Sequence, residues 1–289
     1  MYPFDRPVVE IIPQRHSSRI FNEAKLTAEH VRLLESFMRS VQTGPFGTPV
    51  RFALAAATAD DPGALRSLGT YGLIKHAAGF IIGATGPGVK NLENYGYALE
   101  TIVLYATQLG LGTCWLGGNF TKASFASQIR AARDEIVPAV IAVGYSSEAN
   151  LARDRLRQQA KADTRQPWEK LFFDASLATA LSMAAAGPYA RPLEMLRLAP
   201  SGKNYQPWRI VRQGNCFHFY LPRTAGYGQG SAAALVMGLA DLPRVEIGIA
   251  MSHFELTARE LGLNGQWEIQ APPWADQTTT LEYIATWVG

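Results

Sequence analysis

An internal repeat is the feature that most constrains how this 289-residue chain folds. Residues 96–115 align without gaps with residues 248–267, at an offset of 152 residues (248 − 96). The identical pairs are Gly96/Gly248, Ala98/Ala250, Leu104/Leu256, Ala106/Ala258, Leu109/Leu261, Gly110/Gly262, Leu111/Leu263 and Trp115/Trp267. Such a repeat predicts a chain built from two related halves.

Both copies of the repeat have the pattern of a helix that is apolar nearly all round, which indicates burial. Gly110 and Gly262 follow the expected last turns, where glycine tolerates a left-handed conformation. We therefore expect two helices, one from each half, to pack on each other at the centre of the molecule.

A second, weaker repeat aligns residues 42–52 with residues 200–210, at an offset of 158 (207 − 49). It pairs Gly44 with Gly202 and Pro49 with Pro207. The alanine-rich segment before Gly187 suggests where the halves join. We expect a first half over residues 1–172 and a second over residues 173–289.

Shorter patterns predict a mixture of helices and strands in both halves. In the first half, Thr27 caps a helix that runs to about Ser40, and strands follow at 50–56, 78–83 and 137–144. The second half is expected to hold a short helix at 192–198 and a hairpin formed by 208–211 and 216–221.

Charge and apolar runs exclude several classes of protein. A net charge of +3 on a chain of this length produces only a weak electrostatic field, so we expect no nucleic-acid partner. The densest basic stretch, residues 153–165, is interrupted by Asp154 and Asp163 and is typical of a solvated face, although one of its arginines could reach a phosphate. No apolar run approaches the roughly 18 residues of a membrane helix, so we expect no signal peptide and no membrane partner.

The chain has only two cysteines, Cys114 and Cys216, which cannot form a disulfide framework or a cysteine-rich metal site. Its five histidines are scattered without metal-binding spacing. We therefore expect no metal, and a reducing cytoplasmic location.

Three segments could bind a ligand. Residues 15–19 place arginines beside a histidine and two serines, which suits a phosphate but also an ordinary surface loop. Residues 199–208 offer neutral donors and acceptors that suit a heterocycle edge, although a simple helix-to-strand turn explains them equally well. Residues 110–118 are rich in glycine, which allows close approach to a flat ligand. Trp115 replaces the third glycine of the dinucleotide-binding fingerprint, so a Rossmann domain is disfavoured.

Together the three segments resemble motifs of the FMN-dependent nitroreductase family. They are Arg15-His16-Ser17-Ser18-Arg19, the loop from Pro200 to Trp208, and the helix end that leads into Gly110–Gly118. The resemblance implies the α+β nitroreductase fold, here as two related halves in one chain. The chain is similar to the two-lobed branch of the family, in which a single chain forms a pseudo-dimer.

The resemblance also implies roles for individual residues. Arg15 and Arg19 would hold the FMN phosphate, with His16 and Ser17 near the ribityl chain and the pyrimidine edge. Segments of both halves would complete the FMN site, through Trp115, Leu116, Gly117, Gly118, Arg165, Pro200, Ser201, Gly202, Asn204 and Gln206. Asp163 stands where the family's pattern has a lysine, which weakens part of the phosphate contact. No residue is expected to act as a catalytic acid or base.

The two halves differ in these motifs. Residues 43–49 have lost the serine and asparagine of their counterpart, and residues 174–190 contain no arginine or lysine. We therefore expect one complete and one degraded FMN site in a monomer that acts as an internal pseudo-dimer. The resemblance implies an oxidoreductase that passes hydride from NADH or NADPH through flavin N5 to a small electron-poor substrate such as a nitroaromatic or a quinone. The alternative is a flavin-binding or flavin-storage protein with little turnover.

Overall fold

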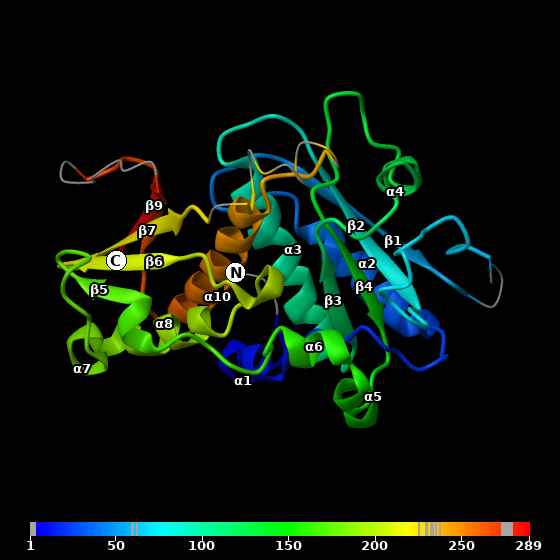
Figure 1. The fold of residues 1–289 in the computed structure, drawn as a ribbon, viewed down its shortest axis with the longest axis horizontal. Coiled ribbons are helices and arrows are strands. Elements are labelled where there is room, and N and C mark those ends of the chain that lie inside the picture. Colours follow the sequence, from blue (N-terminus) through cyan, green and yellow to red (C-terminus); the bar gives the residue numbers. More distant parts are fainter. Residues whose placement is uncertain are drawn as a thin grey trace.

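A computed structural model describes residues 4–58, 61, 63–224, 226–228, 231, 234, 236, 238–272 and 280–289. Two long helices lie side by side in the centre, with one antiparallel sheet beyond them on one side and a mixed sheet on the other (Figure 1). This arrangement is the α+β architecture expected from the sequence.

The central helices are α3 (Asn91–Gln108) and α10 (Leu242–Glu260), and nearly all their residues are buried. Glycines let the helices touch. A Cβ atom on Gly96 would lie 2.0 Å from the backbone oxygen of Val245, and one on Gly248 would lie 2.2 Å from that of Glu93. Adding 152 to Gly96 gives Gly248, and subtracting 152 from Val245 gives Glu93, so each contact is the repeat of the other. The two helices are therefore related by an approximate twofold axis that runs between them.

The first sheet contains β1 (Val50–Ala56), β2 (Gly79–Thr85), β3 (Gly112–Leu116) and β4 (Val140–Gly144), in the order β1-β2-β4-β3. The strands predicted at 50–56 and 78–83 are confirmed, and β4 starts later than expected, after Pro138, whose nitrogen cannot donate to a sheet. Helix α2 (Ala28–Ser40) begins as predicted, with the Thr27 side chain accepting the His30 N–H at 3.1 Å. Strand β3 was not predicted, because Gly112 at its start and the glycines on either side of it obscure a strand pattern.

The second sheet contains β5 (Phe172–Asp174), β6 (Arg209–Gln213), β7 (Cys216–Pro222), β8 (Gln266–Glu268) and β9 (Leu281–Val288), in the order β5-β6-β7-β9-β8. The predicted hairpin is confirmed by the antiparallel pairing of β6 with β7. The predicted short helix is α8 (Ala190–Arg197), which packs on α10. The proposed boundary between residues 172 and 173 lies inside β5 and stays a prediction.

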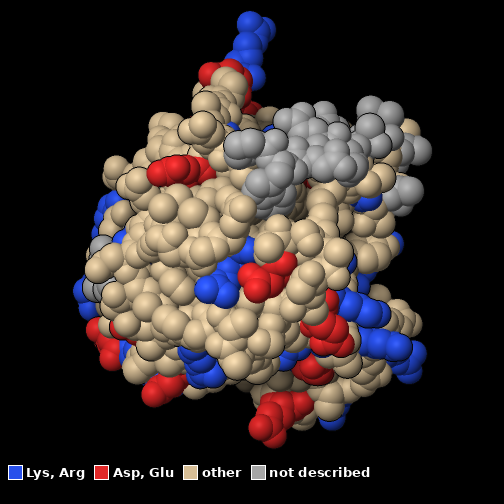
Figure 2. Space-filling view, turned by 90° about the vertical axis from the view of Figure 1, so that its left-hand side faces the viewer, with Lys and Arg blue, Asp and Glu red and all other residues tan. Residues whose placement is uncertain are grey.

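The remaining elements are short. Within the described ranges they are α1 (Val8–Gln14), α4 (Lys122–Gln128), α5 (Glu148–Arg153), α6 (Arg155–Gln159), α7 (Met183–Ala186) and the 3₁₀ turns at Trp168–Lys170, Gly187–Tyr189 and Gly202–Asn204. Among the described residues, no helix is both long and apolar enough to cross a membrane. Figure 2 shows the side of the molecule that carries the second sheet, where acidic and basic side chains are interspersed around a largely uncharged area.

Candidate functional site

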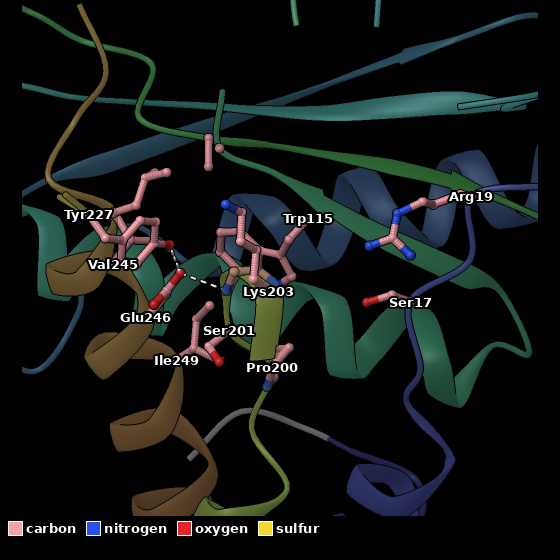
Figure 3. A pocket seen from close by; sticks show the side chains of 14 residues that line it. Ser17, Arg19, Trp115, Pro200, Ser201, Lys203, Tyr227, Val245, Glu246 and Ile249 are labelled. Atoms are coloured by element: carbon pink, nitrogen blue, oxygen red, sulfur yellow. Dashed lines mark hydrogen bonds between the residues drawn. The ribbon is translucent and has the colours of Figure 1, made fainter. Parts of the chain in front are cut away.

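A pocket lies between the two halves, and we call it the interface pocket. It encloses about 580 Å³ of empty space, part of which is open to solvent. The first half contributes Ser17, Arg19, Trp115, Gly117 and Ala139, and the second contributes Pro200, Ser201, Gly202, Lys203, Tyr227, Leu242, Val245, Glu246 and Ile249 (Figure 3). Neither half alone forms the pocket.

The first-half wall is positioned by a strand-like pairing. Ser17 forms a parallel bridge with Thr113 in β3, and the Ser18 N–H donates to the Thr113 carbonyl at 2.8 Å. Successive side chains of an extended segment point to opposite sides, so Ser18 is buried while Ser17 and Arg19 face the pocket. Arg19 is held there by Asp154, the N-cap residue of α6, at 3.0 Å.

The second-half wall is a loop with an unusual backbone. Lys203, Asn204 and Gln206 all have positive φ angles, of 50°, 59° and 52°. Left-handed conformations of residues other than glycine cost about 1–2 kcal/mol each and persist where surrounding contacts impose them. The strain therefore indicates that contacts around the loop hold its backbone in this one conformation.

Side-chain hydrogen bonds impose that shape and tie the loop to the segment before β5. Asn204 Nδ2 donates to the carbonyls of Lys161 and Thr164, at 2.9 and 3.0 Å. Gln206 Oε1 accepts the N–H of Gln166 at 2.8 Å. The loop and the segment that carries Arg165 consequently form one unit.

A second pocket adjoins the same segments, and we call it the arginine pocket. It is lined by Ile12, Pro13, Arg15, His16, Arg157, Ala162, Asp163, Arg165 and Leu198. Asp163 is its one acidic lining residue and pairs with Arg157. The remaining guanidinium groups give the pocket an excess of positive charge, which suits a dianionic phosphate.

The arginines of this pocket are largely withdrawn from water. The Arg15 side chain is 5% exposed, and its Nε makes no hydrogen bond within the described residues, although Glu100 Oε1 lies 3.8 Å away. Arg165 donates to three backbone carbonyls, those of Ala162, Thr164 and Leu198. Burial, together with the Arg15 and Arg197 cations, lowers the pKa of Arg165 to about 10. Buried cations this close together favour a bound anion.

Burial also lowers the pKa of His16, and the Arg15 and Arg157 cations add to the effect. Between the two pockets, Trp115 donates its indole N–H to the fully buried Glu100 at 2.7 Å. Glu100 also contacts His253 of α10, at 2.9 Å. The wall of the interface pocket is thus fixed to both central helices.

The structure brings most of the predicted site residues to these two pockets. Those that line the interface pocket are Ser17, Arg19, Trp115, Gly117, Pro200, Ser201 and Gly202, and those that line the arginine pocket are Arg15, His16 and Arg165. Four others line neither pocket. Leu116 is buried in the core on the other face of β3, Gly118 lies against Leu239, and Asn204 and Gln206 make the hydrogen bonds described above. That any of these residues binds FMN stays a prediction.

Some lining residues could not be picked out from the sequence. Arg157 was one of several arginines in a basic stretch, and only the turn of α6, which its N-cap Asp154 begins, brings it beside Arg15. The motifs gave no indication of Glu246 or Tyr227. The available signal for Glu246 was an acidic residue in a helix whose pattern predicts burial, since a buried carboxyl group is costly unless it has a partner or a role.

Comparisons with known proteins agree with this architecture. The sequence profile of a family described as "Putative TM nitroreductase" matches residues 7–258. The crystal structure of a protein named as a putative nitroreductase from Thermotoga maritima is 21% identical and superposes with a TM-score of 0.60, covering 100% of this chain and 96% of that one. A nitroreductase with bound FMN from Bacteroides fragilis is 19% identical, with a TM-score of 0.35, and covers 50% of this chain and 90% of its own.

A comparison with curated protein sequences found no match. The full-length superposition on the Thermotoga maritima protein shows that the fold is the α+β nitroreductase fold predicted from the motifs. Because the profile match extends over most of the sequence, the chain belongs to the "Putative TM nitroreductase" family.

Proposed function

We propose that this protein binds one FMN between its halves and acts as an oxidoreductase. It takes hydride from NADH or NADPH and reduces a small electron-poor acceptor, such as a nitroaromatic or a quinone. The observation that carries the proposal is the position of the arginine pocket beside the interface pocket. A cationic pocket suited to a phosphate thus adjoins a partly apolar pocket built by both halves.

The residues present fit the chemical groups of FMN. Arg15, which is buried, and Arg157 and Arg165, which are half-buried, offer guanidinium groups to the phosphate. The Nε atoms of Arg15 and Arg165 are buried without a hydrogen-bond partner among the described residues, which supports an anion there. In the interface pocket, the strained loop supplies neutral polar groups for the edge of a flat ring.

When bound, FMN supplies the hydride chemistry at N5, and the protein supplies binding, orientation and electrostatics. Trp115, held by Glu100, gives the pocket a rigid apolar wall that excludes water. Arg19 is kept in place by Asp154 and contributes positive charge at the pocket edge. No side chain is required to act as a general acid or base.

The proposal is tested by the visible absorption spectrum of the purified protein. A protein that is colourless, and remains so after incubation with FMN, would overturn the proposal. Steady-state oxidation of NADH or NADPH with a quinone or a nitrofuran then separates an enzyme from a flavin-storage protein. The storage alternative is motivated by bulky aromatic residues at the pocket, Trp115 and Tyr227 in its lining and Tyr205 packed against Tyr227, and rapid turnover would exclude it.

We predict a stoichiometry of one FMN per chain. In the first half, the counterpart of the loop at 200–208 carries Phe46, which packs against the core of the second half, and the second half has no arginine motif. The measurement is a titration of apoprotein with FMN, followed by flavin fluorescence. Two FMN per chain would show that the second site is intact.

We also predict that Asn204→Ala weakens FMN binding moderately. The substitution removes two hydrogen bonds to the backbone at Lys161 and Thr164, so Arg165 is held less firmly at the arginine pocket. A neutral hydrogen bond contributes about 0.5–1.5 kcal/mol, so we expect a loss of roughly 1 kcal/mol in binding free energy. The dissociation constant measured by fluorescence titration checks this, and an unchanged constant would contradict the positioning role.

A further inference from the structure

Glu246 is a buried carboxyl group in the wall of the interface pocket. It is 6% exposed and lies near the start of α10. Its Oε1 accepts hydrogen bonds from the Gly202 N–H, at 2.7 Å, and from the Tyr227 hydroxyl (Figure 3). Its Oε2 is buried and has no hydrogen-bond partner among the described residues.

The internal repeat provides a reference for this position, because the counterpart of Glu246 at the 152-residue offset is Asn94. Asn94 Oδ1 accepts the Phe46 N–H at 2.9 Å, as Glu246 Oε1 accepts that of Gly202. Its Nδ2 donates to the Val89 carbonyl at 3.4 Å. In the first half, one neutral acceptor, Asn94 Oδ1, is therefore enough to hold the loop that carries Phe46. Glu246 holds its own loop through Oε1 and has a second oxygen, Oε2, that is not needed for this contact.

The hydrogen bonds determine where a proton on Glu246 resides. Oε1 already accepts from two donors, so the proton of the neutral acid lies on Oε2. Burial raises the pKa of Glu246 to about 8, with a further contribution from Asp241, while the Tyr227 and Gly202 donors act in the opposite direction. Near neutral pH, the group therefore presents an O–H donor at the pocket wall.

Other charged groups near Glu246 are paired with one another or exposed to solvent. Asp241 is paired with Arg223 at 2.8 Å, and Arg244, on the same helix, is paired with Glu93 at 2.6 Å. Across the pocket, Arg19 is paired with Asp154, and Lys203 is exposed to solvent. Tyr227 donates to Glu246, and its own pKa is raised by burial and by that carboxyl group. Glu246 is thus a pocket-lining carboxyl group whose Oε2 is bonded to no other described residue.

We propose that Glu246 is a flavin-binding residue of the interface pocket. Its neutral carboxyl group donates Oε2–H to a carbonyl oxygen of the bound flavin, and this hydrogen bond is lost when the carboxyl group ionises. This inference rests on the proposed function, because it takes FMN as the ligand. Loop positioning is a separate task of the same side chain and uses only Oε1.

Glu246→Gln separates the two tasks. The glutamine oxygen accepts from Gly202 and Tyr227 as before, and its Nε2 donates at every pH. We expect equal FMN affinity for wild type and variant near about pH 6, and an affinity roughly tenfold weaker for wild type near about pH 9.5, where Glu246 is ionised. The variant Glu148→Gln, which removes an exposed carboxylate of α5, should follow the wild-type curve.

The free energy of unfolding gives a readout that requires no flavin. The folded state holds the proton up to about pH 8, whereas the unfolded chain releases it near its ordinary pKa of 4.5. In that interval the unfolded state binds fewer protons, so the contribution of Glu246 to stability falls as pH rises. Urea titrations of apoprotein should show this decline in wild type and its loss in Glu246→Gln. Infrared difference spectra should show a protonated-carboxyl band that the variant lacks.

The outcomes distinguish the two proposals. A wild-type protein that binds no FMN at any pH overturns the proposed function and the flavin contact with it. FMN binding with the same pH dependence in wild type and Glu246→Gln overturns the role of Glu246 and leaves the proposed function standing. A protonated-carboxyl band that persists in the variant also overturns that role.

Discussion

Arg15→Ala is expected to weaken FMN binding by about 1.5–3 kcal/mol, or roughly 10- to 150-fold in the dissociation constant. Arg15 is the most deeply buried cation of the arginine pocket, and the phosphate would lose a charge-assisted hydrogen bond to this buried side chain. The measurement is a fluorescence titration of apoprotein with FMN. Riboflavin, which lacks the phosphate, should bind wild type and variant with similar affinity.

Two further variants make this result interpretable. Arg191→Ala removes an exposed arginine of α8 in the second half and should leave the affinity unchanged. Arg15→Lys keeps the charge but not the forked geometry, so its affinity should lie between those of wild type and Arg15→Ala. Arg15 also lies 3.8 Å from the buried Glu100, so thermal unfolding of each variant must be measured as well. A loss of affinity in Arg191→Ala would mean that FMN binds elsewhere.

The central helices could be predicted from the sequence because their signal is local and repeated. An apolar helix with no polar face can only be buried, and two copies require a shared interface. The repeat also aligned Gly44 with Gly202, and in the structure a Cβ on either glycine would contact its helix counterpart, Asn94 or Glu246. Elements that have a periodic apolar pattern and recognisable capping residues could therefore be predicted from the sequence.

The finer design of the site depends on contacts between distant residues, which no pattern along the chain encodes. Asn204 was expected to contact FMN, yet its amide donates to carbonyls that lie about forty residues earlier in the chain. Arg157 could not be distinguished from the neighbouring arginines, because its direction depends on how the short helix α6 packs. Glu246 was hidden inside a helix whose overall pattern is that of a core element.

Gly96→Ala is expected to destabilise the whole protein, by about 2 kcal/mol. The new Cβ would lie 2.0 Å from the backbone oxygen of Val245, and a carbonyl inside α10 cannot move without moving the helix. Overpacking of this kind costs about 1–3 kcal/mol and occasionally more. Alanine gains up to about 1 kcal/mol of helix propensity over glycine, which the clash outweighs. Gly248→Ala should behave alike, because its Cβ would meet the Glu93 oxygen at 2.2 Å.

Chemical denaturation followed by circular dichroism and by tryptophan fluorescence checks this prediction. Because α3 and α10 connect both sheets, the two probes should report one shared transition at a lower denaturant concentration. Gly86→Ala is the matched control, since a Cβ atom at Gly86 would have no neighbour within 4 Å among the described residues, and its stability should change by less than about 0.5 kcal/mol. If Gly96→Ala unfolded in two separated steps, the halves would unfold as independent domains. The packing of α3 against α10 would then not couple them into one cooperative unit.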